Sequence, residues 1–142
     1  MRYSELIQIY FERSTALQSY WTLYVVVIGG LLAFSSLRVR PDPLTALLVT
    51  VLFCLFAYKN LGAIHDTTRQ RFAVLQAIHQ TSAAAPETSD AGQVAKILDP
   101  TLVAPAYEGI RNFHIVSDLL TIAAIGAMER RRMRKAQNQV DT

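Results

Sequence analysis

The chain has 142 residues, of which 51% are hydrophobic and 18% are charged, and its formal net charge is +3. This length suits a single domain. The single cysteine and three scattered histidines exclude an internal disulfide and a zinc-finger pattern. The hydrophobic residues are concentrated in three blocks, which predicts an all-α integral membrane protein with three transmembrane helices.

The first block, residues 19–37, carries no charge, and about twenty such residues are enough to cross a bilayer. Tyr20, Trp21 and Tyr24 cluster at its start, where an aromatic belt is expected at the membrane interface. Apolar and aromatic residues also recur upstream at helical spacing. We therefore predict one continuous helix over residues 3–37 that includes this span.

The segment before the first span has one patterned face, made by Tyr3, Leu6, Tyr10, Arg13 and Leu17. An alternative interpretation of the N-terminal region is a cleaved signal peptide. About twenty residues precede the apolar run, however, and they include Glu5 and Glu12, whereas a signal peptide starts with a short basic segment. The pattern favours a retained helix.

The second block spans residues 44–64 and ends near Lys59, which can extend its ammonium group to the interface. The intervening "RVRPDP" ends one helix and starts the next, so the first two spans are predicted to be antiparallel neighbours. Helical spacing continues to residue 80, which predicts a helix over residues 44–80. The patterned face of this extension comprises Leu61, His65, Thr68, Phe72, Leu75 and His79.

The extensions of these two helices are predicted to emerge on the same side of the membrane and pack as an antiparallel helical hairpin stalk. The alternative is that each extension lies in the interface as an amphipathic helix. The small, polar residues 81–93 predict a flexible linker, and a short helix is expected at residues 94–98.

A third helix is predicted over residues 106–137, with its span at residues 110–128. Arg111, His114 and Asp118 interrupt this span, so the alternative is an amphipathic helix on the membrane surface. The stretch "LLTIAAIGAM" is apolar on all sides, which favours a crossing. Residues 129–142 form a basic tail.

An ionised Asp118 near the centre of the third span would cost about 2.5–3.5 kcal/mol on insertion scales. It is therefore expected to face protein, together with the other polar groups on its side of the helix. We predict an intramembrane polar cluster made of Tyr24, Lys59, Arg111, His114, Asp118 and Thr121. The favoured interpretation is a network that holds the helices in register. The alternative is a proton- or ion-handling site.

Small residues, a basic cluster and two histidines also have possible roles. Close helix packing, within the chain or between copies, is expected at the small residues Gly29, Gly30, Ala33, Ala123 and Ala127. A topology anchor that attracts anionic lipid headgroups is expected at Arg130, Arg131, Arg132, Arg134 and Lys135. His65 and His114 lie near span ends, but no motif supports haem or metal ligation, and we expect no cofactor and no metal site.

The density of positive charge after the third span favours a plasma-membrane protein with its N-terminus outside and its C-terminus in the cytoplasm. No phosphate loop, nucleophile elbow or paired carboxylates are present, so we expect no enzyme. Nucleic-acid binding has no supporting motif. The favoured function is a scaffold, anchor or accessory subunit in a homo-oligomer or larger membrane complex. The alternatives are a homo-oligomeric channel or proton conduit that uses His114 and Asp118, and a haem- or metal-carrying membrane subunit.

Overall fold

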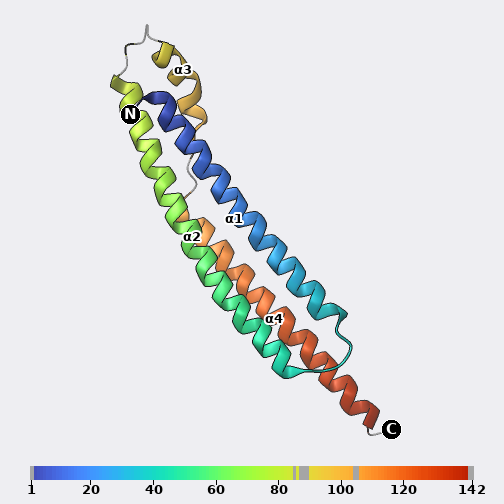
Figure 1. Ribbon diagram of the computed structural model, residues 1–142. Coiled ribbons are helices and arrows are strands. Elements are labelled where there is room, and N and C mark those ends of the chain that lie inside the picture. The colour runs from blue at the N-terminus through green and yellow to red at the C-terminus, as the bar shows by residue number, and fades with distance from the viewer. Residues whose placement is uncertain (1, 85, 87–89, 104–105, 141–142) are drawn as a thin grey trace. The chain divides into compact units, whose positions relative to one another are not determined.

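The computed structural model describes residues 2–84, 86, 90–103 and 106–140. Helices are the only regular secondary structure in this part of the chain, which confirms the all-α part of the predicted fold class. The elements are α1 (Tyr3–Leu37), α2 (Pro43–Ala84), α3 (Asp90–Leu98), the short 3-10 helix η1 (Asp99–Thr101) and α4 (Tyr107–Val140) (Figure 1).

The chain divides into two compact units, and α1 and α2 each contribute to both. Unit 1 comprises Met1–Tyr20 and Ala63–Gly109, and unit 2 comprises Trp21–Gly62 and Ile110–Thr142. Sequence analysis expected a single membrane domain. Unit 1 has a small apolar core, and unit 2 buries His114, Asn60 and Glu129 together with a few apolar side chains.

Among the described residues, two helices, α1 and α2, are long and apolar enough to cross a membrane, and α4 is less apolar. Only 11% and 22% of the apolar windows of α1 and α2 are buried within the structure. The third crossing and the hairpin stalk remain predictions.

The linker prediction needs a correction. Helix α2 continues to Ala84 and α3 begins at Asp90, so residues 81–84 and 90–93 are helical rather than part of a flexible linker. Alanine, which recurs at the end of α2, has the highest helix propensity of any residue and outweighs the polar character of this stretch. Residues 85 and 87–89 of the predicted linker lie outside the described residues.

Helix α2 has a strong start signal in the sequence. Asp42 precedes Pro43, the first helical residue, and a proline is pre-organised for that position. The backbone N–H of Thr45 donates to Asp42 Oδ1 over 3.1 Å, which is the hydrogen bond expected of an N-cap. The preceding helix, α1, ends at Leu37, before the proline-containing stretch.

The core of unit 1 joins the first part of α1 to the last part of α2. It consists of the buried residues Leu6, Tyr10, Leu75, Ile78 and Leu102. Leu6, Tyr10 and Leu75 lie on the faces predicted from sequence. Phe72, which the same spacing placed on the α2 face, is 53% exposed, and Ile78 is buried instead.

Hydrogen bonds fasten the segment after α3 to this core. Tyr3 Oη donates to Asp99 Oδ1 over 2.8 Å, and Ser82 Oγ donates to Asp99 Oδ2 over 2.6 Å. Burial, with this acceptor carboxylate as a further cause, raises the pKa of Tyr3 to about 12. Tyr10 Oη and the Arg71 guanidinium both donate to the carbonyl oxygen of Val103, at 2.9 and 2.8 Å.

Candidate functional site: two polar clusters among apolar helices

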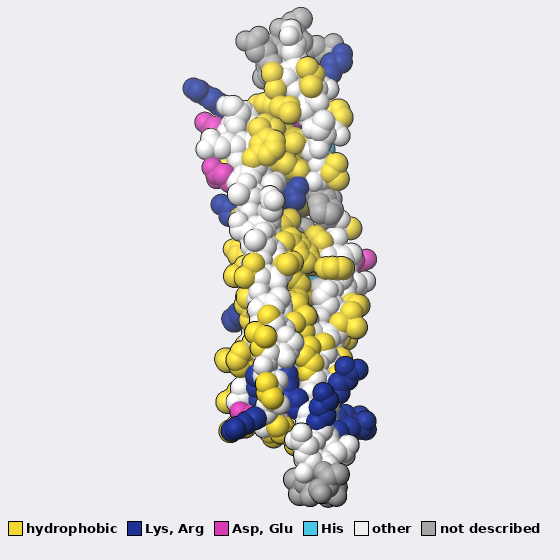
Figure 2. Space-filling view, turned by 90° about the vertical axis from the view of Figure 1, so that its right-hand side faces the viewer, with side chains coloured by type: hydrophobic (Ala, Val, Ile, Leu, Met, Phe, Trp, Pro, Cys, Tyr) yellow, Lys and Arg dark blue, Asp and Glu magenta, His cyan; other side chains and the backbone are white. Residues whose placement is uncertain are grey.

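Unit 2 buries several polar side chains and exposes many large apolar ones. The buried polar residues Tyr24, Asn60, His114 and Glu129 are each at most 5% exposed. Many large apolar side chains of the same three helices are about half exposed or more, among them Val25, Leu47, Val51, Leu52, Val116 and Leu120. Figure 2 shows hydrophobic side chains covering the helices, with Lys and Arg gathered toward the C-terminal end of α4. Buried polar groups and exposed large apolar groups are the informative departures from ordinary burial.

The first polar cluster is centred on His114, whose side chain is fully buried. Its Nδ1 lies 2.9 Å from Asp118 Oδ2, one helical turn along α4, and its Nε2 lies 3.3 Å from Asn60 Nδ2 on α2. Because an amide nitrogen can only donate, Nε2 accepts this hydrogen bond. The tautomer with its proton on Nδ1 fits both contacts, because that proton then points to the Asp118 carboxylate.

Tyr24 brings α1 into the same cluster. Its ring stacks on the His114 imidazole with centroids 4.0 Å apart. Its hydroxyl donates to Asp118 Oδ1 over 2.8 Å and lies 3.2 Å from the His114 carbonyl oxygen. Trp21 lies beside this pair, with its ring 6.0 Å from the imidazole. Polar side chains from three helices therefore satisfy one another within unit 2.

The structure brings together only part of the cluster predicted from sequence. Tyr24, His114 and Asp118 meet as expected, and Thr121 is buried on the same face, where its hydroxyl donates to the Ser117 carbonyl oxygen. Lys59 does not join them, because it is exposed.

Arg111 also lies outside the cluster: it is exposed and contacts the side chain of Asn112. The prediction missed Asn60, which follows the exposed Lys59 and lies on the buried face of α2. A single residue step turns a helix by about 100° and therefore changes the face. The spacing of Phe53, Ala57 and Asn60, all buried, is the signal that identifies this residue.

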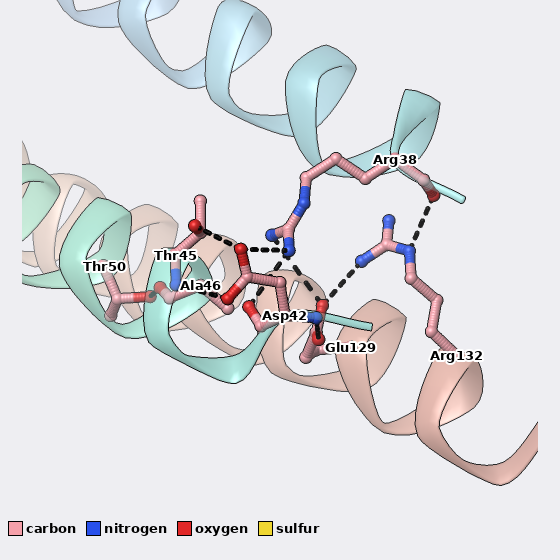
Figure 3. A network of polar contacts seen from close by, with 7 residues as sticks. All are labelled: Arg38, Asp42, Thr45, Ala46, Thr50, Glu129 and Arg132. Atoms are coloured by element: carbon pink, nitrogen blue, oxygen red, sulfur yellow. Dashed lines mark hydrogen bonds and ion pairs between the residues drawn. The ribbon is translucent and has the colours of Figure 1, made fainter. Parts of the chain in front are cut away.

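The second polar cluster links the ends of the same helices around Glu129 (Figure 3). Glu129 Oε1 accepts the backbone N–H of Asp42 at 2.6 Å, and Oε2 accepts Arg132 Nη1 at 2.9 Å. Arg38 Nη1 lies 3.8 Å from the same Oε2. Glu129 therefore joins α4 to the end of α1 and the start of α2.

The arginines of this cluster make further contacts that fix their positions. Arg132 Nε donates to the Arg38 carbonyl oxygen over 2.8 Å, and Arg38 Nη2 donates to the Asp42 carbonyl oxygen over 3.0 Å. The Thr45 hydroxyl and backbone N–H, followed by the Arg38 charge, hold the pKa of the Asp42 carboxyl below its usual range. Sequence analysis placed Glu129 in the tail and did not identify this role, although Glu129 continues the buried α4 spacing of Thr121 and Ile125.

The remaining predicted residues are exposed. Arg130, Arg131, Arg134 and Lys135 point to the surface of α4. The small residues Gly29, Gly30, Ala33, Ala123 and Ala127 are exposed as well. A Cβ added at Gly29 or Gly30 would meet nothing within 4 Å, so packing within the chain does not require glycine at these positions.

The histidines considered for haem or metal have other neighbours. His65 contacts the Tyr107 ring at 4.6 Å and Asp66 Oδ1 at 3.4 Å. Among the described residues, no group of three or more His, Cys, Asp or Glu side chains is placed to hold a metal ion.

Comparison with known proteins identified no family model, no curated protein and no solved structure that matches the chain.

Proposed function

We propose that this chain is a small, non-enzymatic integral membrane protein that crosses the plasma membrane three times and acts as an anchor, scaffold or accessory subunit of a larger membrane assembly. The observation that carries this proposal is the distribution of side chains in unit 2, where polar groups are buried against one another and large apolar groups face outward. Such an arrangement suits hydrocarbon surroundings.

The buried network supports a crossing by α4. His114 and Asp118 lower the hydropathy of this helix, but both are engaged with Tyr24 and Asn60. The outward surface of the same stretch is apolar and includes Phe113, Val116, Leu119 and Leu120. The polar residues that weaken α4 as an isolated span would therefore not face lipid in the bundle.

The same contacts favour a structural role over ion conduction. The two polar clusters are separated by about eleven residues of α4, or about 16 Å along the helix. Between them along α4 and α2 lie Ile125 and Phe53, which are 3% and 2% exposed. These apolar side chains interrupt a polar path, whereas each cluster by itself ties three helices together.

Replacement of Asp118 by Asn tests this role. Asn keeps the shape and a hydrogen-bond acceptor but removes the carboxylate that receives the His114 and Tyr24 protons. We expect the free energy of unfolding in detergent to fall by about 1–3 kcal/mol, and we expect no proton or cation flux from wild type or variant in liposomes. Asp66→Asn, at an exposed position, is the matched control and should change neither property.

The conduit alternative predicts a different result from these liposomes. Because Asn cannot exchange a proton, a conduit through this site would give wild-type flux that disappears in Asp118→Asn and is partly retained in Asp118→Glu. Such a flux would overturn the proposed role. Native mass in detergent then distinguishes a defined homo-oligomer from a chain that copurifies with a different subunit.

A further inference from the structure

The end of unit 2 that carries Glu129 contains an open, basic groove of about 760 Å³. It lies between the segment that follows α1 and the C-terminal part of α4. Its cationic lining residues are Arg38, Arg40, Arg131, Arg132 and Lys135. Among the described residues, no Asp or Glu lines this groove. The groove therefore presents a concentrated positive charge.

Two of these cations are held in place before any ligand arrives. Arg38 and Arg132 are 15% and 11% exposed and share the buried Glu129 carboxylate. By contrast, Arg40, Arg131 and Lys135 are exposed, and they form no ion pair with any described residue. Fixed guanidinium groups beside exposed cations suit a phosphate group, because Arg and Lys side chains both donate to phosphate oxygens and attract their negative charge.

The basic run of α4 is divided between two faces of the helix. Arg131, Arg132 and Lys135 line the groove, whereas Arg130 and Arg134 do not. Residues four apart share a helix face, so Arg131 and Lys135 point to the groove together, with Arg132 beside them, and Arg130 and Arg134 share a face outside it. A diffuse attraction to anionic surfaces would use all five cations equally. The geometry gives three of them a separate role.

Apolar side chains beside the groove indicate a ligand that also carries hydrocarbon. Val39, which is 87% exposed, and Met128 line it together with the cations. The helices that lead into it expose large apolar side chains such as Phe34 and Leu44. A ligand that joins an anionic group to hydrocarbon would satisfy both surfaces at once, and basic pockets at the cytoplasmic ends of transmembrane helices bind such headgroups.

We propose that this groove binds the headgroup phosphate of an anionic phospholipid, with the exposed Arg131 and Lys135 as its direct ligands and Arg38 and Arg132 as fixed positive charges behind them. This inference rests on the proposed membrane placement of unit 2. A topology anchor attracts anionic headgroups through its overall charge, whereas this groove would bind one headgroup through a defined set of residues. A free phosphate or an acidic protein segment would be alternative occupants.

A pair of double variants with equal charge change tests the site. Arg131→Gln/Lys135→Gln removes two groove cations, and Arg130→Gln/Arg134→Gln removes two cations from the other face of the same helix. The purified full chain in detergent is titrated with phosphatidylglycerol and, separately, with phosphatidylcholine, and bound lipid is counted by native mass spectrometry. We expect the groove variant to bind phosphatidylglycerol at least about ten-fold more weakly than wild type. The control variant should bind it like wild type, and phosphatidylcholine should not distinguish the three proteins.

Each contrary outcome identifies an error in the inference. Equal weakening by both variants would show diffuse charge attraction, and no weakening by the groove variant would show that the lipid does not bind in the groove. Displacement of the lipid by equimolar inorganic phosphate would assign the groove to a free anion. Retention of an acidic protein through the groove cations, without lipid preference, would assign it to a protein partner. Release of the wild-type chain from membranes by alkaline carbonate would instead contradict the proposed membrane function, independently of the lipid titration.

Discussion

Single side chains in unit 2 show how a charged residue can be accommodated within an apolar helix. His114 and Glu129 are at most 5% exposed. His114 has hydrogen-bond partners on α1 and α2, and Glu129 has hydrogen-bond and ionic partners in the segment that connects those two helices. Removing one partner from a buried polar pair leaves the other uncompensated, which costs more than the pair contributes. These two residues therefore constrain how the three helices pack.

Asp42 allows a test of the second cluster through pH. Its pKa is lowered in the folded protein, so its ionised form stabilises the fold above the ordinary aspartate pKa of about 4. This contribution is lost as the pH falls through the lower, folded-state value. Asp42→Asn should keep the helix cap, because Asn and Asp cap equally well, but should lose the charge interaction with Arg38.

Unfolding of wild type and Asp42→Asn in detergent, measured from pH 7 to about pH 2, checks this expectation. Wild type should be the more stable protein at neutral pH, and its advantage should disappear in acid. An advantage that persists unchanged at the lowest pH would contradict the role of the ionised carboxylate.

Sequence reasoning identified the centre of the first cluster but not all its members. A polar stripe at helical spacing on one apolar helix was enough to select His114 and Asp118. Which residues of the other helices face this cluster depends on how each helix is rotated about its axis. An apolar block without a polar stripe does not reveal that rotation. As a result, Lys59 was chosen for its charge although Asn60, one position further on, is buried. Glu129 was missed because it adjoins a run of arginines and resembles part of a solvated tail.

Helices α1 and α2 are longer than a bilayer crossing requires. Helix α1 has 35 residues and α2 has 42, whereas a span needs about twenty. Their apolar blocks belong mainly to unit 2, and their remaining residues supply the core of unit 1. Helical periodicity predicted α1 accurately because no breaker interrupts it. The end of α2 was harder to place, because alanines extend the helix past the point at which the polar linker composition begins.

Leu75 tests whether the extensions of α1 and α2 stabilise one another. It is 8% exposed in the unit 1 core, whereas Phe72 on the same helix is 53% exposed. Leu75→Ala should lower the free energy of unfolding by about 2–4 kcal/mol, because it leaves a cavity beside Leu6 and Tyr10. Phe72→Ala should cost less than about 1 kcal/mol, since little of its contact area is buried.

Thermal and denaturant unfolding of both variants in the same detergent provides the measurement. If the two extensions lay separately on the membrane surface, Leu75→Ala would leave global unfolding unchanged. A larger effect of Phe72→Ala than of Leu75→Ala would likewise contradict the core described for unit 1.

For the whole molecule, the central claim is that the chain crosses the membrane three times. Two crossings are indicated by length and composition, and the third depends on the burial of His114 and on its pairing with Asp118 within unit 2. With three crossings, the α3 region and the C-terminal part of α4 lie on opposite sides of the membrane. With two, they lie on the same side.

Cysteine labelling in intact cells distinguishes these topologies most directly. In a Cys54→Ser background, single cysteines replace the exposed Gln93 in α3 and the exposed Gln137 near the end of α4. We predict that Gln93→Cys reacts with a membrane-impermeant maleimide before the cells are opened and that Gln137→Cys reacts only afterwards. The reverse order would retain three crossings but overturn the proposed orientation. Reaction of both cysteines under the same condition would place them on one side and contradict the crossing by α4.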